Sequence, residues 1–401
     1  MESEMIKELR KCLDDNILYY WLDRMVDSRG GFYGRRDGFD MLDRDAPKGA
    51  ILNARILWSF AAAFRLTGNF AYELLASRAR DYIRDRFMDN VYGGVYWSVS
   101  ADGKPLDTRK QFYAIAFAIY GLAEHYRATG DEESLRMAQS LFNDIETHSL
   151  DREKGGYLEA QTRDWHPIAD MRLSEKDDNS AKTMNTHLHI MEGYTALLRV
   201  WRSPELLDAT KGLLRIFLDR ILDKDTGHLG LFFNDDWERE DGIFSYGHDI
   251  EASWLMLETA MVIGDDGLYK ETLAATEKIA MAALEGRRED GSMIYERHAD
   301  GSLDDDRHWW VQAENVIGQL YLAAYHGKPE FVGAAAESWR YIKEKLIDPG
   351  KGEWYWSRRG CDGSINREED KAGFWKCPYH NSRMCIEGIE TLSKITGCQN
   401  K

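Results

Sequence analysis

The chain has 401 residues, of which 43% are hydrophobic and 12% aromatic, and its formal net charge is −17. This acidic balance argues against nucleic acids and anionic membranes as partners, because both require clustered Lys and Arg. No apolar stretch approaches the length of a membrane span. Five cysteines form no CxxC pair, and the charged segment 1–14 lacks the apolar core of a secretory signal, so we expect a reduced cytoplasmic protein.

Apolar residues recur at helical spacing along most of the chain and predict six pairs of helices. In chain order the predicted helices cover residues 3–25, 50–66, 71–87, 110–127, 132–147, 182–200, 204–222, 248–263, 268–284, 309–325, 329–346 and 378–396. Short breaks such as Thr67-Gly68-Asn69 join the members of a pair. No Pro- or Ser-rich linker divides the chain, so we expect one domain over residues 1–401.

Similar glycine- and aromatic-rich segments separate the helix pairs at intervals of about 60 to 70 residues. They are Gly30–Tyr33, Gly93–Trp97, Gly155–Leu158, Gly227–Phe232, Asp290–Tyr295 and Gly350–Trp356. Each is a short alternating run suited to a hairpin strand. Six hairpins between six helix pairs predict an all-α fold, an (α/α)6 barrel.

Helices that follow a hairpin begin with polar and aromatic residues although their middles are apolar. These residues are Asn53, Arg55, Gln111, Tyr113, Asn185, His189, His248, Glu251, Trp309, Trp310, Glu314, His380, Asn381 and Arg383. A polar collar at the same end of every inner helix predicts a funnel-shaped site at one mouth of the barrel. The 13 Trp and 20 Tyr are consistent with sugar stacking, although many of these rings could simply close the barrel ends.

His248 and Glu251 are three residues apart and share one helix face, so we expect Glu251 to accept a hydrogen bond from one ring nitrogen of His248. The alternative is an ordinary helix ion pair. Asn185 and His189, four residues apart, suit one polar edge of a substrate. His187 lies between them on another face, and we interpret it as structural.

His380 could form the opposite wall of the funnel as a second acid/base. Arg55 lies among aliphatic residues and needs an anion or an oxygen as partner; a structural salt bridge is the alternative. His189, His248 and His380 with a carboxylate could instead bind a metal, but they come from separate helices without chelating spacing. We therefore expect no metal, and without a glycine-rich phosphate loop no nucleotide cofactor.

Five segments resemble the N-acylglucosamine 2-epimerase family, and the resemblance covers nearly the whole chain. They are Asn53–Trp58, Lys182–Asn185, Ser245–Ala252, Trp309–Glu314 and Trp375–Asn381. The resemblance implies an (α/α)6 barrel with His248 and His380 as the acid/base pair, supported by Glu251. It places Arg55 and His189 near the reacting C1–C2 oxygens. The residues expected to bind substrate are Tyr113, Asn185, Trp237, Trp309, Trp310, Glu314 and Trp375.

The resemblance implies reversible epimerisation at C2 of the reducing-end glucose of β-1,4-linked disaccharides such as cellobiose and lactose. The ring would open, and proton transfer would pass through an enediolate without a cofactor. We expect a monomer or weak homodimer. Alternatives are an aldose–ketose isomerase, an N-acylglucosamine or mannose 2-epimerase, a non-catalytic sugar-binding protein, and an (α/α)6 hydrolase or lyase. An inverting hydrolase would need opposed carboxylates, for which Glu251, Glu314 and Asp306 are the plausible supply.

Overall fold

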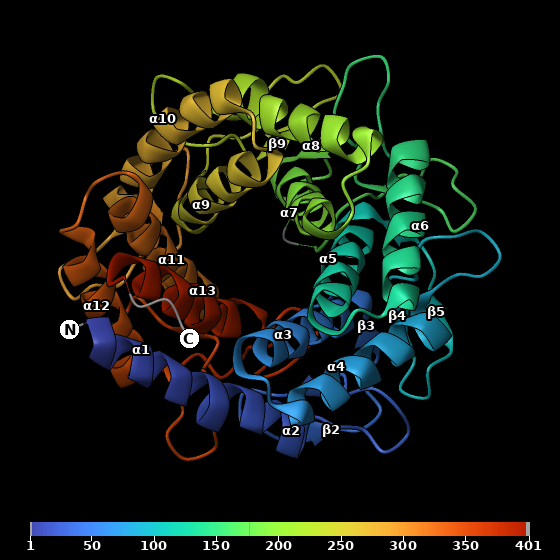
Figure 1. Cartoon of the computed structure of the whole chain (residues 1–401), viewed down its shortest axis with the longest axis horizontal. Coiled ribbons are helices and arrows are strands. Elements are labelled where there is room, and N and C mark those ends of the chain that lie inside the picture. The colour runs from blue at the N-terminus through green and yellow to red at the C-terminus, as the bar shows by residue number, and fades with distance from the viewer. Residues whose placement is uncertain (1, 176, 398–401) are drawn as a thin grey trace.

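The computed structural model describes residues 2–175 and 177–397, which form two concentric rings of helices (Figure 1). The inner ring consists of α3 (Ala50–Thr67), α5 (Phe112–Thr129), α7 (Met184–Val200), α9 (Tyr246–Ile263), α11 (Trp309–Tyr325) and α13 (Tyr379–Ile395). Each inner helix packs against the next, and α13 packs against α3, so the ring is closed. The predicted (α/α)6 barrel is confirmed.

The outer ring consists of one helix behind each inner helix. Its members are α4 (Phe70–Tyr82), α6 (Glu132–His148), α8 (Pro204–Ile216), α10 (Asp266–Ala283), α12 (Phe331–Tyr341), and a first helix formed by α1 (Glu2–Lys11), the π-helical segment Cys12–Leu18 and α2 (Tyr19–Arg24). Further π-helical turns cover Ile83–Phe87, Phe217–Ile221 and Ile342–Leu346, and Leu284–Gly286 is a 3₁₀ turn. The first outer helix lies against α13, so the two ends of the chain complete the sixth pair.

The helices of the two rings differ in how much of their surface is buried. Inner helices such as α9 are buried on nearly every side over their first three turns, whereas the outer helix α8 buries one stripe only. Asn69, Asp131 and Asp265 cap outer helices with side-chain hydrogen bonds. None of the helices in the described parts of the chain combines the length and apolar character needed to cross a bilayer.

Short antiparallel strands join neighbouring pairs at one end of the ring. They are β1 (Arg35–Arg36), β2 (Leu42–Asp43), β3 (Lys48–Gly49), β4 (Ser98–Val99), β5 (Pro105–Asp107), β6 (Lys110–Gln111), β7 (Ala160–Gln161), β8 (Lys182–Thr183), β9 (Phe232–Phe233), β10 (Phe244–Ser245), β11 (Glu296–Arg297), β12 (Leu303–Asp304), β13 (Arg307–His308) and β14 (Ser357–Arg358). The sheets are β1-β2, β3-β4-β5, β6-β7, β8-β9, β10-β11-β12 and β13-β14. A strand that enters an inner helix thus pairs with a strand of the next repeat.

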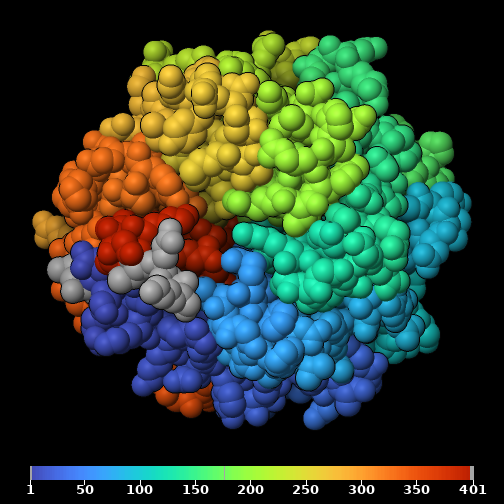
Figure 2. Space-filling model, in the orientation of Figure 1, coloured from blue at the N-terminus to red at the C-terminus, as the bar shows by residue number. Residues whose placement is uncertain are grey.

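The predicted glycine-rich hairpins are found in all six repeats. Isolated bridges close them at Val26–Phe32, Met88–Val95, Leu150–Tyr157, Leu222–Leu229, Arg287–Met293 and Ile347–Trp354. Three inner helices differ by two residues from their predicted starts, because Lys110–Gln111 and Lys182–Thr183 pair as strands and α9 begins two residues before His248; α13 begins one residue later than predicted. Figure 2 shows one end of the molecule, where the repeats follow one another in sequence order around the rim.

Candidate active site

His380 lies in the first turn of α13 and is held there by a carboxylate from α11. Its Nδ1 is 2.7 Å from Oε1 of Glu314, whose Oε2 accepts a hydrogen bond from Trp254 Nε1 at 2.9 Å. Arg383 donates to Oε1 as well. Because these buried donors occupy both oxygens, Glu314 holds His380 in place, and a contact of Glu314 with substrate stays a prediction.

Arg383, one turn further along α13, joins carboxylates from three inner helices. Its Nη2 donates to Oε1 of Glu251 at 2.5 Å and to Oε1 of Glu314 at 2.7 Å, and its Nη1 donates to Glu192. All four side chains are buried, and such charges are tolerated only when they are paired. Ligand atoms of Glu251, Glu314 and His380 lie within 4.8 Å of one another, a spacing suited to a metal, but the guanidinium already supplies positive charge there.

His248 does not have the partner predicted for it. Its Nδ1 is 2.9 Å from the hydroxyl of Ser245, whereas Glu251 points to Arg383. The spacing of three residues does put His248 and Glu251 on one face of α9. However, the fully buried guanidinium of Arg383 competes for the carboxylate, and sequence spacing does not reveal that tertiary neighbour.

Trp310 lies between the two candidate acid/base residues. The centroid of its ring system is 4.8 Å from that of His248 and 5.6 Å from that of His380. The two imidazoles, from α9 and α13, are therefore close enough to meet one small substrate. Trp309 packs on Trp356, with ring centroids 4.4 Å apart, and edge-on against His380 at 6.3 Å.

His189 and Arg55 occupy the neighbouring wall, on α7 and α3. Nδ1 of His189 is 2.8 Å from Oε2 of Glu192, and its ring packs edge-on against Tyr113 with centroids 5.0 Å apart. Nη2 of Arg55 donates to the Tyr113 hydroxyl at 2.9 Å, and its guanidinium lies 4.1 Å from the ring centroid of Phe117. The partner expected for Arg55 is thus a phenolic oxygen rather than a carboxylate.

The bonds at Nδ1 determine what each ring offers a substrate. A carboxylate behind Nδ1 holds the proton on that nitrogen and leaves Nε2 of neutral His189 and His380 with a lone pair. Burial lowers the pKa of His189 and of His248 to about 3, and burial also places the pKa of His380 well below its usual value. At neutral pH the three imidazoles are neutral and can accept protons.

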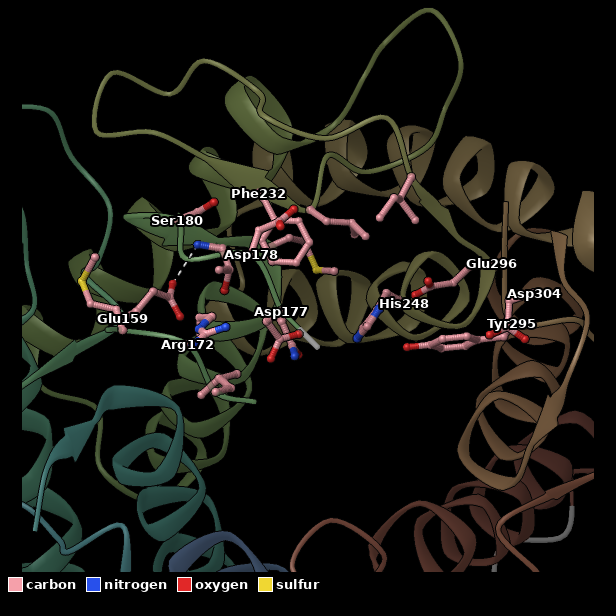
Figure 3. A pocket seen from close by; sticks show the side chains of 17 residues that line it. Glu159, Arg172, Asp177, Asp178, Ser180, Phe232, His248, Tyr295, Glu296 and Asp304 are labelled. Carbon is pink, nitrogen blue, oxygen red and sulfur yellow. Dashed lines mark hydrogen bonds between the residues drawn. The ribbon is translucent and has the colours of Figure 1, made fainter. Parts of the chain in front are cut away.

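A cavity of about 270 Å³ opens beside His248 (Figure 3). One side is formed by the loop between β7 and β8, including Arg172 and Asp177. The other side is formed by α9 and the hairpin after α10, from which Tyr295 extends toward His248. Asn185 also lines this cavity, and its buried Oδ1 has no hydrogen-bond partner within the described part of the chain, so it is available to a substrate.

Trp375 belongs to the aromatic wall beside Tyr113. Its ring centroid is 6.1 Å from that of Tyr113 and 6.0 Å from that of Trp97. The ring is only partly buried, so one part of it remains accessible next to Arg55, whose Nη1 lies 3.5 Å from the Trp375 carbonyl oxygen.

Trp237 lies in the hairpin turn after β9, and His187 lies in the first turn of α7. Trp237 donates from Nε1 to the carbonyl oxygen of Lys154 at 3.1 Å and packs against His187 with ring centroids 5.2 Å apart. Nδ1 of His187 bonds the Thr183 carbonyl, and Nε2 accepts from the Tyr157 amide at 2.9 Å. These contacts agree with a structural role for His187. They attach Trp237 to the neighbouring hairpin, and its part in a sugar-stacking wall stays a prediction.

Two partners of the candidate residues were not predicted from the sequence. Glu192 lies in the apolar run Ile190–Tyr194, and a charge in such a run signals a buried partner. Ser245 immediately precedes an inner helix, where a serine is ordinarily interpreted as a helix cap. Its bond to His248 depends on the rotamer of the hydroxyl and gives no sequence signal.

Comparison with known proteins agrees with this geometry. Residues 31–382 match the model of the N-acylglucosamine 2-epimerase (GlcNAc 2-epimerase) family. A cellobiose 2-epimerase of Bacteroides fragilis is 56% identical over 96% of this chain and 99% of its own. A cellobiose 2-epimerase of Ruminococcus albus is 40% identical over 96% of this chain and 98% of its own. The solved structure of cellobiose 2-epimerase from Bacillus thermoamylovorans is similar with a TM-score of 0.92 at 38% identity, covering 97% of this chain and 99% of that one.

Proposed function

The chain belongs to the N-acylglucosamine 2-epimerase family, and from this premise we propose that it is a cellobiose 2-epimerase. It interconverts cellobiose and glucosyl-mannose by inverting C2 of the reducing-end sugar, and lactose is the expected second substrate. The observation that supports this most strongly is the pair of buried, neutral imidazoles, His248 and His380, in contact with the same indole of Trp310.

The proposed reaction begins with opening of the reducing-end ring to its aldehyde. Nε2 of one imidazole then removes the proton from C2, and the electron pair passes into an enediolate. Arg55 stabilises its negative oxygen by charge, and Nε2 of His189 accepts a hydrogen bond from its remaining hydroxyl. Return of a proton to the other face of C2, from the opposite imidazole or after rotation about C2–C3, gives the mannose configuration. The sugar supplies its own carbonyl, so the reaction requires neither redox cofactor nor metal.

The carboxylate behind His380 suits the proposed role of this imidazole as a base. When His380 takes up a proton, the positive charge forms 2.7 Å from Glu314, and that interaction stabilises it. Asn185 and the accessible part of Trp375 are positioned to hold the sugar. We also propose that the protein is cytoplasmic and is a monomer or weak homodimer. Analytical ultracentrifugation of the purified protein would distinguish the monomer from the dimer.

Incubation with cellobiose in D2O, followed by NMR, tests the reaction directly. We expect deuterium at C2 of a mannose-configured reducing end, with the glycosidic linkage intact. A ketose product would indicate an isomerase, and free glucose would indicate a hydrolase; either as the main product would contradict the proposal. A parallel incubation with N-acetylglucosamine tests the competing monosaccharide substrate.

A further inference from the structure

Ser245 precedes α9 in the N-cap position, yet its hydroxyl does not cap the helix. By contrast, Thr183 in the equivalent position before α7 caps the Thr186 amide at 3.1 Å. A serine that caps stabilises a helix by about 1 kcal/mol, and Ser245 forgoes that contribution. Its hydroxyl is fully buried and instead lies 2.9 Å from Nδ1 of His248.

Glu296 lies on the other side of the Ser245 hydroxyl. The two residues are directly opposite each other in the antiparallel pair β10–β11, where opposed side chains lie on the same face of a sheet. This cross-strand position brings the carboxyl beside Ser245, whose hydroxyl acts to lower the pKa of Glu296. Glu296 and His248 line the same cavity, and Figure 3 shows Glu296 extending toward His248 from the hairpin. A carboxylate, a hydroxyl and an imidazole thus stand in sequence.

The surroundings of Glu296 suit a group that exchanges protons near neutral pH. Burial raises its pKa to about 7, and the charges of Asp304, opposite it on β12, and of Asp177, on the β7–β8 loop, act in the same direction. Hydrogen bonds from Tyr295 and Ser245 act in the opposite direction. His248 is the imidazole that faces the same cavity from α9.

We propose that Glu296, Ser245 and His248 form a proton relay in which Glu296 stores the proton that His248 takes from C2 of the sugar. This inference rests on the proposed epimerase function and adds a positioning residue to it. As the C2–H bond breaks, the proton joins Nε2 of His248, and Nδ1 gives its proton to the Ser245 oxygen. Ser245 in turn gives its own proton to the Glu296 carboxylate, while the C2 electron pair enters the enediolate. The reverse sequence returns the proton.

The relay lets His248 act as a base and as an acid without becoming a cation. This matters because burial opposes its protonation so strongly. His380 differs, because its Nδ1 contacts Glu314 without an intervening hydroxyl. When Glu296 is ionised, Ser245 donates to it and accepts from Nδ1–H, so Nε2 carries the lone pair. When Glu296 is protonated, Ser245 can donate to Nδ1, and Nε2 carries the hydrogen.

Steady-state kinetics with cellobiose test the relay. We expect Glu296→Gln and Ser245→Ala each to lower kcat about 10- to 100-fold, the range typical of a lost proton-transfer partner, with KM changed less than about twofold. The double variant should lose no more than either single variant, because both interrupt one relay. Ser245→Thr keeps the hydroxyl and should restore most of the activity. Asp300→Asn, an exposed change in the same hairpin, is the matched control and should leave kcat unchanged.

Two further readouts distinguish a relay from a merely structural role. In the wild type kcat/KM should fall as the pH drops through about 7, because Glu296 must be ionised to accept the proton, and Glu296→Gln should abolish that step. Nitrogen-15 NMR of the His248 ring should find Nδ1–H above pH 8 in the wild type and Nε2–H in Glu296→Gln.

Losses that add in the double variant, an unchanged ring tautomer, or Glu296→Gln kinetics equal to those of Asp300→Asn would overturn the relay. Failure of the wild type to place deuterium at C2 would overturn the epimerase function itself. An active wild type with an unaffected Glu296→Gln variant would reject only the relay.

Discussion

In all three candidate active-site histidines, Nδ1 contacts a supporting side chain and Nε2 is left to meet the substrate. Nδ1 of His189 and of His380 contacts a carboxylate, and Nδ1 of His248 contacts a hydroxyl. Each ring is held in one orientation by a partner from its own or a neighbouring helix. Because burial keeps the rings neutral, each can accept a proton at neutral pH. The carboxylates behind His189 and His380 compensate the charge that would form there, whereas the partner behind His248 is an uncharged hydroxyl.

His248→Ala and His380→Ala should each lower cellobiose epimerisation at least about 100-fold, the lower end of the usual contribution of general acid/base catalysis. The carboxylates behind His380 stay paired with Arg383 in His380→Ala, so the protein should fold and still bind sugar. Deuterium incorporation at C2 measures catalysis, and calorimetric titration with cellobiose measures binding. Near wild-type turnover in either variant would reject its role, and lost binding together with a lowered melting temperature would indicate a structural one.

At the residue scale, the amino-acid sequence predicts which residue types the site contains. It does not predict which of these residues pair with one another. The collar of polar residues at the helix starts included His248, Glu251, His380 and Arg383. Spacing along one helix suggested the wrong pair, His248 with Glu251, because the pairing is decided between helices. Arg383 on α13 reaches Glu251 on α9, a helix on the other side of α11, from a position 132 residues further along the chain.

At the scale of elements, buried lysine–aspartate pairs fix the hairpins to the starts of the inner helices. Nζ of Lys48 lies 2.8 Å from Asp27, and the corresponding distance for Lys110 and Asp89 is 3.0 Å. Lys182, which precedes α7 and its His189, lies 2.8 Å from Asp151. The same pair thus recurs before three consecutive inner helices, α3, α5 and α7, and ties each of these helix starts to its hairpin.

Lys182→Met should lower the free energy of unfolding by about 3 kcal/mol, because it leaves the Asp151 carboxylate without its partner. The exposed pair of Lys154 and Asp236 lies in the same repeat and provides the control: Lys154→Met should cost less than about 1 kcal/mol. Urea titrations of both variants at pH 7 give the comparison. Equal losses in the two variants would mean that the Lys182–Asp151 pair adds no more stability than the exposed pair.

The loss in Lys182→Met should depend on pH. Burial alone would raise the pKa of Asp151, but the Lys182 ammonium and two backbone amides hold it below its usual value. A carboxyl with a lowered pKa stabilises the fold above its unfolded pKa of about 4 and loses that contribution as the pH falls through the folded value. The difference between wild type and Lys182→Met should therefore shrink below pH 4.

Helix pairs and hairpins are predictable because apolar residues recur every 3.6 residues in a helix and every 2 in a strand, a pattern visible in a short stretch of sequence. Strand pairing between repeats is not. Lys110–Gln111 and Lys182–Thr183 were assigned to helices, although they pair with Ala160–Gln161 and Phe232–Phe233. Two-residue strands are too short to show alternation, so only the packing of one repeat on the next defines them.

At the scale of the whole molecule, the ring is closed by segments from opposite ends of the chain. The family match begins at residue 31, yet α1 and α2 form the outer helix behind α13. Nε1 of Trp21 donates to Oε2 of Glu353 at 2.7 Å, and Oε1 of Glu353 accepts from Asn381, the neighbour of His380, at 2.6 Å. The first helix is therefore connected to the active site through two hydrogen bonds.

Leu9→Ala in α1 tests whether closure makes the ring a single cooperative unit. Leu9 is fully buried against α13, close enough that a Cβ on Gly388 would lie 2.9 Å from its Cδ1. The cavity left by the smaller side chain should cost about 3 kcal/mol, whereas Lys7→Ala on the exposed face of α1 should cost less than about 0.5 kcal/mol. Because α1 completes the last helix pair, far-UV circular dichroism and epimerase activity should be lost at the same, lowered urea concentration in Leu9→Ala. Activity that survives an earlier, partial loss of helix signal would mean instead that α1 unfolds separately from a ring that stays closed without it.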